Sequence, residues 1–86
     1  MRKINTKSGY IAYSCSALEI KIIGGLGICD ECNKTARNGY LVPVLNHYMC
    51  GDCFKEWDVS ATYYPEDIPF EKKYAAYYEA VIGLKE

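Results

Sequence analysis

The clearest pattern of hydrophobic and polar positions lies near the C-terminus, where large hydrophobic side chains recur every three or four residues between charged ones. This spacing is typical of an α-helix that buries one face. It predicts a helix over residues 70–82, for which Gly83 is a suitable C-cap. The hydrophobic positions are Phe70, Tyr74, Tyr77, Tyr78 and Val81.

A second helix is predicted to open with the cysteine pair Cys50 and Cys53, since hydrophobic residues again lie three or four positions apart after it. Asp52 would fall in the first turn of this helix, where the helix dipole favours an anion. Pro65 cannot continue a helix, so we expect the helix to end there and residues 65–69 to form a rigid connector. The hydrophobic positions are Phe54, Trp57, Ala61 and Tyr64.

The N-terminal third alternates in a different way. Residues 18–22 alternate between apolar and charged side chains, which is the pattern of a half-buried strand, and residues 10–15 are rich in aromatic and β-branched side chains. A β-hairpin is therefore predicted over residues 9–23, with a glycine-rich segment leading on to residue 28. The polar residues 1–8 are predicted to form an N-terminal arm.

A second hairpin is predicted from strand-forming residues at 40–44 and 47–49. Asn38 and Gly39 before it form a strong turn signal. Pro43 has no N–H group to donate, so we expect this strand at a sheet edge. The elements together predict an α+β domain with two hairpins and two C-terminal helices.

The length and the charge of the chain narrow its function. With 86 residues the chain forms one domain, and a domain of this size buries a limited core and often needs a bound metal. The net charge is −1, but residues 1–49 carry +3 and residues 50–86 carry −4. Because this is not the basic footprint of a nucleic-acid binder, that function is kept only as an alternative. Its phosphate contacts would be Arg2, Lys3, Lys7, Lys34 and Arg37.

Two Cys-x-x-Cys pairs, separated by 17 residues, are the strongest chemical signal. Four thiols at this spacing are typical of a tetrahedral structural zinc site, although iron can occupy the same donor set. His47 precedes the second pair by three residues, so it could replace Cys53 as a ligand or support a ligand through a hydrogen bond. The predicted ligands of one zinc ion are Cys29, Cys32, Cys50 and Cys53.

The cysteines also indicate a compartment. An odd count of five, four of them in Cys-x-x-Cys pairs, favours a reducing environment over a disulfide framework. The N-terminus has no apolar signal core, and no apolar stretch is long enough to span a bilayer. We therefore expect a cytoplasmic protein without a membrane partner. Cys15 has no basic neighbour to activate it, so it is expected to be a small buried hydrophobe.

Nine tyrosines are many for so short a chain. They either fill a thin core or form a protein-binding surface. Adjacent residues cannot share one helix face, so at least one of Tyr77 and Tyr78 should be available to a partner. No catalytic grouping is visible, and a four-sulfur site leaves no open position, so the chain is not expected to be an enzyme. The candidate interface residues are Tyr63, Tyr74, Tyr77 and Tyr78.

The predicted order of a cysteine knuckle, a hairpin and a helix that opens with the second cysteine pair resembles a treble-clef zinc finger over residues 29–64. The spacing of the four cysteines is also that of GATA-type fingers, whose ligands match these positions one by one. GATA-type fingers read DNA with basic hairpin residues, whereas this hairpin carries Leu41, Val42 and Val44. The resemblance therefore implies zinc binding without DNA reading.

Two further resemblances bear on partners. The cysteine module is similar to half of a LIM domain, which implies protein interaction. Over its whole length the chain resembles small zinc proteins of Gram-positive gut bacteria and their mobile elements, which implies no function. The leading hypothesis is thus a non-enzymatic module that docks on another protein. The alternatives are a nucleic-acid-binding finger and a mobile-element inhibitor of a host enzyme.

Overall fold

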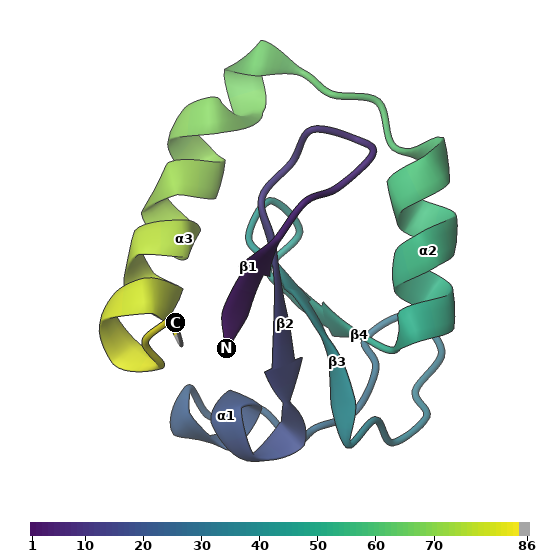
Figure 1. Cartoon of the computed structure of the whole chain (residues 1–86), viewed down its shortest axis with the longest axis vertical. Coiled ribbons are helices and arrows are strands. Elements are labelled where there is room, and N and C mark those ends of the chain that lie inside the picture. Colours follow the sequence, from purple (N-terminus) through teal and green to yellow (C-terminus); the bar gives the residue numbers. More distant parts are fainter. Residues whose placement is uncertain (85–86) are drawn as a thin grey trace.

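The computed structural model describes residues 1–84, which form a four-stranded antiparallel sheet with helices on both faces (Figure 1). The strand order is β1-β2-β3-β4, so neighbours in the chain are neighbours in the sheet. The predicted α+β class is confirmed. The strands are β1 (Arg2–Ile4), β2 (Ala12–Ser16), β3 (Asn38–Val42) and β4 (His47–Met49). The helices are α1 (Ala17–Ile22), α2 (Gly51–Ser60), the 3-10 turn η1 (Pro65–Asp67) and α3 (Ile68–Val81).

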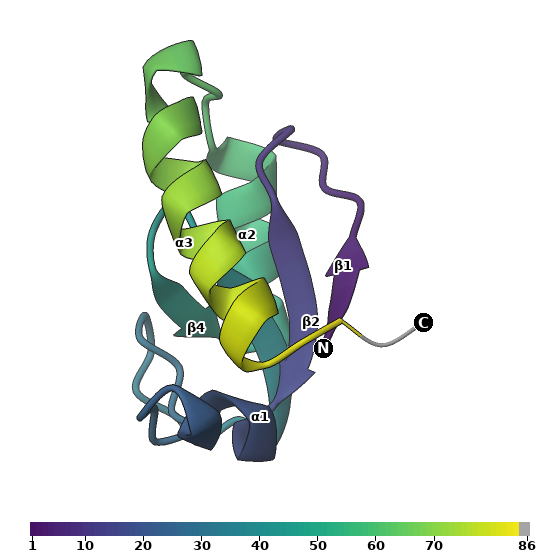
Figure 2. The same cartoon turned by 90° about the vertical axis from the view of Figure 1, so that its left-hand side faces the viewer.

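The two faces of the sheet carry separate hydrophobic clusters. On one face α1 and α3 pack against β2 to β4, and on the other α2 packs against β3 and β4 (Figures 1 and 2). Successive residues of a strand project to opposite faces, which explains why Tyr13 joins one cluster and Ala12 the other. The α3 cluster is Met1, Tyr13, Cys15, Ile20, Ala36, Leu41, Tyr48, Ala75 and Tyr78. The α2 cluster is Ala12, Cys29, Val42, Met49 and Phe54.

The predicted N-terminal arm at residues 1–8 is wrong, because this segment belongs to the sheet. β1 pairs with β2, with Arg2 opposite Ser14 and Ile4 opposite Ala12. The residues after β1 are also held, since the N–H groups of Lys7 and Ser8 donate to the Asp58 carboxylate. Short edge strands often carry charged residues, so the sequence of β1 looks like that of a polar tail.

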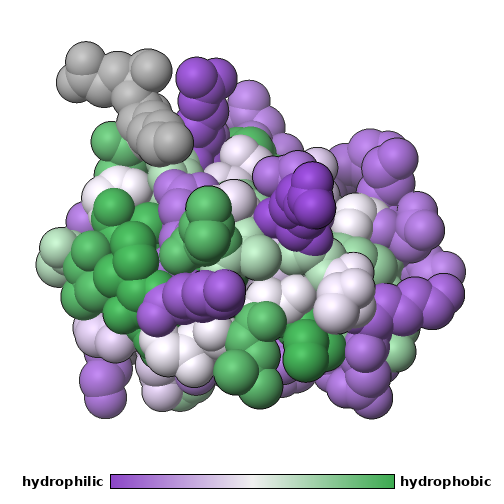
Figure 3. All heavy atoms as spheres, turned by 90° about the horizontal axis from the view of Figure 1, so that it is seen from below, coloured by the Kyte–Doolittle hydropathy of each residue, from purple (hydrophilic) through white to green (hydrophobic). Residues whose placement is uncertain are grey.

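The predicted strand at residues 18–22 is also wrong, because these residues form α1. Ser16 and Glu19 form a capping box: the Ser16 hydroxyl accepts from the Glu19 N–H at 3.3 Å, and Glu19 Oε1 accepts from the Ser16 N–H at 2.9 Å. Ile20 faces the core, while Leu18 and Ile22 point outward, so hydrophobic side chains gather on this end of the molecule (Figure 3). The first hairpin is therefore β1–β2 and not residues 9–23.

The predicted second hairpin is confirmed as β3 and β4, but the turn and the edge position predicted for it are not observed. Asn38 and Gly39 lie within β3 and not in a turn, and a Cβ on Gly39 would come within 2.5 Å of the Met49 carbonyl oxygen. β3 is a central strand, paired with both β2 and β4, so the predicted edge position is wrong. Pro43 is tolerated because it comes after the last residue of the strand.

The two C-terminal helices are confirmed with altered ends. α2 stops at Ser60, four residues before Tyr64, because the backbone is already extended at Ala61. Tyr64 is extended as well, as expected of the residue that precedes a proline. α3 starts at Ile68, two residues earlier than predicted, since its first turn accepts Pro69. Gly83 has a φ of +85°, as expected of a residue just beyond the end of a helix.

Candidate metal centre

The first cysteine pair lies on a tight knuckle between α1 and β3. The Cys29 N–H donates to the Lys34 carbonyl at 2.9 Å, and the Asn33 N–H donates to the Cys29 carbonyl at 2.9 Å. Asn33 adopts a left-handed backbone with a φ of 63°, which asparagine tolerates better than most residues. The knuckle thereby turns both thiols toward one point.

The second cysteine pair opens α2. Cys50 is the N-cap residue, and Cys53 lies one turn later in the same helix. The start of the helix is fixed on the sheet by Phe54, whose ring stacks on Tyr40 of β3 with centroids 4.3 Å apart. The positions of Cys50 and Cys53 therefore depend on the helix and on the packing of Phe54 against Tyr40.

Asp30 joins the knuckle to the hairpin. Its N–H donates to the Tyr48 carbonyl at 2.8 Å, and its carboxylate accepts from the Tyr48 N–H at 2.9 Å. These two bonds place the knuckle beside β4, which leads directly into Cys50. Sequence reasoning missed this role, for which the acidic residue after the first cysteine was the available signal.

The four sulfur atoms converge as the sequence predicted. The Sγ atoms of the two pairs all lie within 4.8 Å of one another, and those of Cys32 and Cys50 are 3.8 Å apart. With Zn–S bonds of about 2.3 Å, the edge of a ZnS₄ tetrahedron measures about 3.8 Å. The four thiols of Cys29, Cys32, Cys50 and Cys53 are therefore placed to hold one metal ion, and their spacing is compatible with zinc.

The acid–base properties of the cluster favour a bound cation. Burial raises the pKa of the Cys29 thiol, but the backbone N–H groups of Cys50, Cys32 and Glu31 donate to its sulfur and bring the pKa to about 6. The side chain of Cys50, together with a smaller effect of burial, raises the pKa of Cys53. Neighbouring thiolates repel one another, so a cation is needed to stabilise all four together.

His47 does not belong to the group of four ligands among the described residues. It lies on β4, and its Nδ1 is 3.0 Å from Glu31 Oε1 on the knuckle. This contact links the strand to the loop that carries Cys29 and Cys32. The recorded partner of His47 is therefore Glu31 and not one of the four cysteines, and both predicted roles of His47, as an alternative ligand or as a hydrogen-bond partner of a ligand, stay predictions.

The fifth thiol and the candidate interface tyrosines lie elsewhere. Cys15 is buried beside α1, as expected of a small buried hydrophobe, and burial raises the pKa of its thiol to about 12. Tyr63 and Tyr77 are 39% and 48% exposed. Tyr74 is half-buried, and Tyr78 is wrong as an interface residue because it is 1% exposed and its hydroxyl donates to Asn46.

The comparisons with known proteins give no family. No family model, curated protein or solved structure matches the chain. Within residues 1–84 no helix is long and apolar enough to cross a membrane.

Proposed function

We propose that this chain is a non-enzymatic protein-interaction module held together by one structural zinc ion. The order of knuckle, β3–β4 hairpin and α2 supports a treble-clef arrangement of the site. Four thiolates would complete a tetrahedron and leave no position for a substrate or a reactive water. The role of the metal is then to fix the hairpin against α2.

The observation that carries the proposal is an aromatic stripe on α3. Phe70, Tyr74 and Tyr77 lie at positions i, i+4 and i+7, which is one flank of the helix. Phe70 and Tyr77 are each 48% exposed, and the rings of Phe70 and Tyr74 lie 4.8 Å apart. A helix with aromatic side chains at this spacing suits a hydrophobic groove on a partner.

Three carboxylates of the acidic C-terminal half have structural roles. Glu71 is buried and accepts from the Ile11 N–H at 2.8 Å, and Asp67 accepts from the Tyr10 hydroxyl at 2.7 Å. Asp58 accepts from two N–H groups near the N-terminus. These carboxylates hold the fold together, which supports a non-enzymatic function.

The test is quantitative capture of a partner from the native cell by the zinc-loaded chain. Photo-crosslinkers placed at Phe70 and at Tyr77 should link one recurring protein. Tyr77→Ala should weaken binding of that protein by about tenfold or more, as expected for an aromatic anchor. Val59→Ala is a matched control, since Val59 is 71% exposed on α2, away from the stripe. No recurring crosslink, or equal losses in both variants, would refute the proposed surface.

A further inference from the structure

Part of the sheet face that carries α2 is polar and open. The register places Arg2 opposite Ser14 and Ser14 opposite Tyr40, so their side chains form one row across three strands. Tyr40 stacks on Phe54 of α2, which identifies the face. Ser16 and Asn38 form the next row on the same face.

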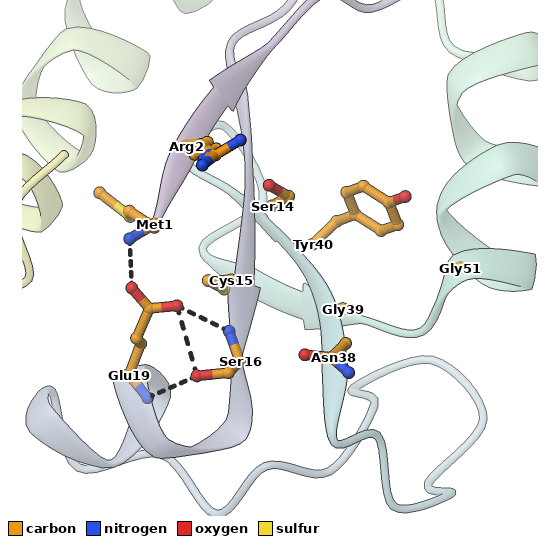
Figure 4. A pocket seen from close by; sticks show the side chains of 10 residues that line it. All are labelled: Met1, Arg2, Ser14, Cys15, Ser16, Glu19, Asn38, Gly39, Tyr40 and Gly51. Carbon is orange, nitrogen blue, oxygen red and sulfur yellow. Dashed lines mark hydrogen bonds and ion pairs between the residues drawn. The ribbon is translucent and has the colours of Figure 1, made fainter. Parts of the chain in front are cut away.

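This region is hollow. A cavity of about 490 Å³ lies between these strands and the start of α2, with Gly51 on the far wall (Figure 4). Figure 4 shows Arg2 and Ser14 on the strand side, with Tyr40 projecting toward α2. The volume is within the range of small-ligand sites.

The cavity wall carries hydrogen-bond donors that the protein does not use. Within residues 1–84, the side chains of Arg2, Ser14, Asn38 and Tyr40 have no hydrogen-bond or ion-pair partner. The single acidic residue in the wall is Glu19, and its carboxylate is engaged by the Ser16 N–H and by the Met1 amine. The unpaired groups are therefore one guanidinium, two hydroxyls and one amide.

We propose that this hollow binds a small oxyanion, a carboxylate or a phosphate group, with Arg2 as the principal contact. A guanidinium presents parallel N–H donors that match two oxygens of such a group. Ser14, Asn38 and Tyr40 supply further donors along the same row. A cationic ligand would meet the unpaired charge of Arg2, and an apolar ligand would leave these polar groups without partners.

Negative charge on the α2 side of the cavity should lower its affinity for an oxyanion. Asp52 lies in the first turn of α2, and four thiolates with a zinc dication beyond Gly51 carry a net negative charge. Binding of a free ion should therefore be weak and should depend on Arg2. The expected dissociation constant is in the millimolar range.

The experiment is a nuclear magnetic resonance titration of the zinc-loaded chain at constant ionic strength. Inorganic phosphate and acetate are added in separate series, which distinguishes the two oxyanions. At least one series should give saturable shifts confined to the amides of Ser14, Ser16, Asn38 and Gly39. Arg2→Gln should weaken this binding by about tenfold, which corresponds to about 1.4 kcal/mol.

Lys3→Gln is the matched control. Lys3 is the next residue of β1 and is also exposed, but it pairs with Tyr13 and projects to the opposite face. The Lys3→Gln variant should bind the oxyanion with the same affinity as the unmodified chain. Linear shifts without saturation, shifts spread over all lysines and arginines, or equal effects of both substitutions would overturn the proposal. None of these outcomes bears on capture of a protein by the α3 stripe.

Discussion

Asp58 fastens the N-terminal segment to α2, so its replacement measures how firmly that segment is held. Asp58 is 8% exposed, and its two carboxylate oxygens accept from the N–H groups of Lys7 and Ser8, each at 2.9 Å. Asp58→Ala would remove both acceptors. The two N–H groups would then have to find water at a partly buried position.

The expected cost comes from these two bonds. A hydrogen bond to a charged group contributes about 1.5–3 kcal/mol, and water can replace part of it at the edge of the fold, so the loss should be about 3 kcal/mol. Small domains unfold with free energies of about 5–15 kcal/mol, so this is a large share. Asp58→Asn should cost less, because one amide oxygen can still accept.

The pH dependence should change as well. Burial raises the pKa of Asp58, but the N–H groups of Lys7 and Ser8 lower it more, so the pKa lies below its usual value. The stabilisation is therefore complete above the unfolded pKa of about 3.9 and is lost as the pH falls through the lower folded pKa. In Asp58→Asn this part of the acid-induced loss of stability should disappear.

Urea denaturation of the zinc-loaded chain measures the free energy of unfolding, and hydrogen exchange at Lys7 and Ser8 measures the local effect. Asp52→Ala is the control, because Asp52 is exposed on the same helix, and it should change stability by less than about 1 kcal/mol. Equal costs for both alanine variants, or unchanged exchange at Lys7 and Ser8, would refute this account of the N-terminal segment.

Three further predictions concern the metal centre and the alternative function. A strong chelator under reducing conditions should unfold at least residues 29–60, and an unchanged circular dichroism spectrum would contradict a structural zinc ion. Native mass spectrometry should find one zinc ion in His47→Ala, with the zinc affinity reduced by at most about tenfold. In Cys53→Ser the zinc affinity should fall by more than about a hundredfold. A larger loss in His47→Ala than in Cys53→Ser would make His47 the ligand. Electrophoretic mobility at low salt should show no retardation of mixed DNA and RNA by micromolar protein, and retardation that weakens steeply with salt would favour nucleic-acid binding.

The elements that the sequence predicted well are those whose signal is local and chemical. The two Cys-x-x-Cys pairs predicted a cluster of four thiols, because two thiols three residues apart can point to one place from a knuckle or a helix turn. The helix at residues 68–81 has almost four turns of regular spacing, so its pattern outweighs any competing one. Length and repetition made these predictions reliable.

The elements that it predicted badly are short, and their structure depends on distant contacts. Residues 18–22 alternate like a strand, yet the Ser16–Glu19 capping box and the burial of Ile20 make them a helix. β1 has three residues and is held by pairing with β2 and by the bonds from Lys7 and Ser8 to Asp58. The capping box was visible in the sequence, whereas the partners of β1 were not.

The distribution of the core gives a physical reason for a metal site beside α2. The α3 face buries nine clustered residues, including the three tyrosines Tyr13, Tyr48 and Tyr78, whereas the α2 face buries five. One of those five is Cys29 itself. Hydrophobic burial therefore contributes less to stability on the α2 face than on the α3 face. The four cysteines lie on the α2 side, where they bring the start of α2 next to the knuckle. A metal ion bound by the four cysteines would therefore supplement the smaller of the two hydrophobic clusters.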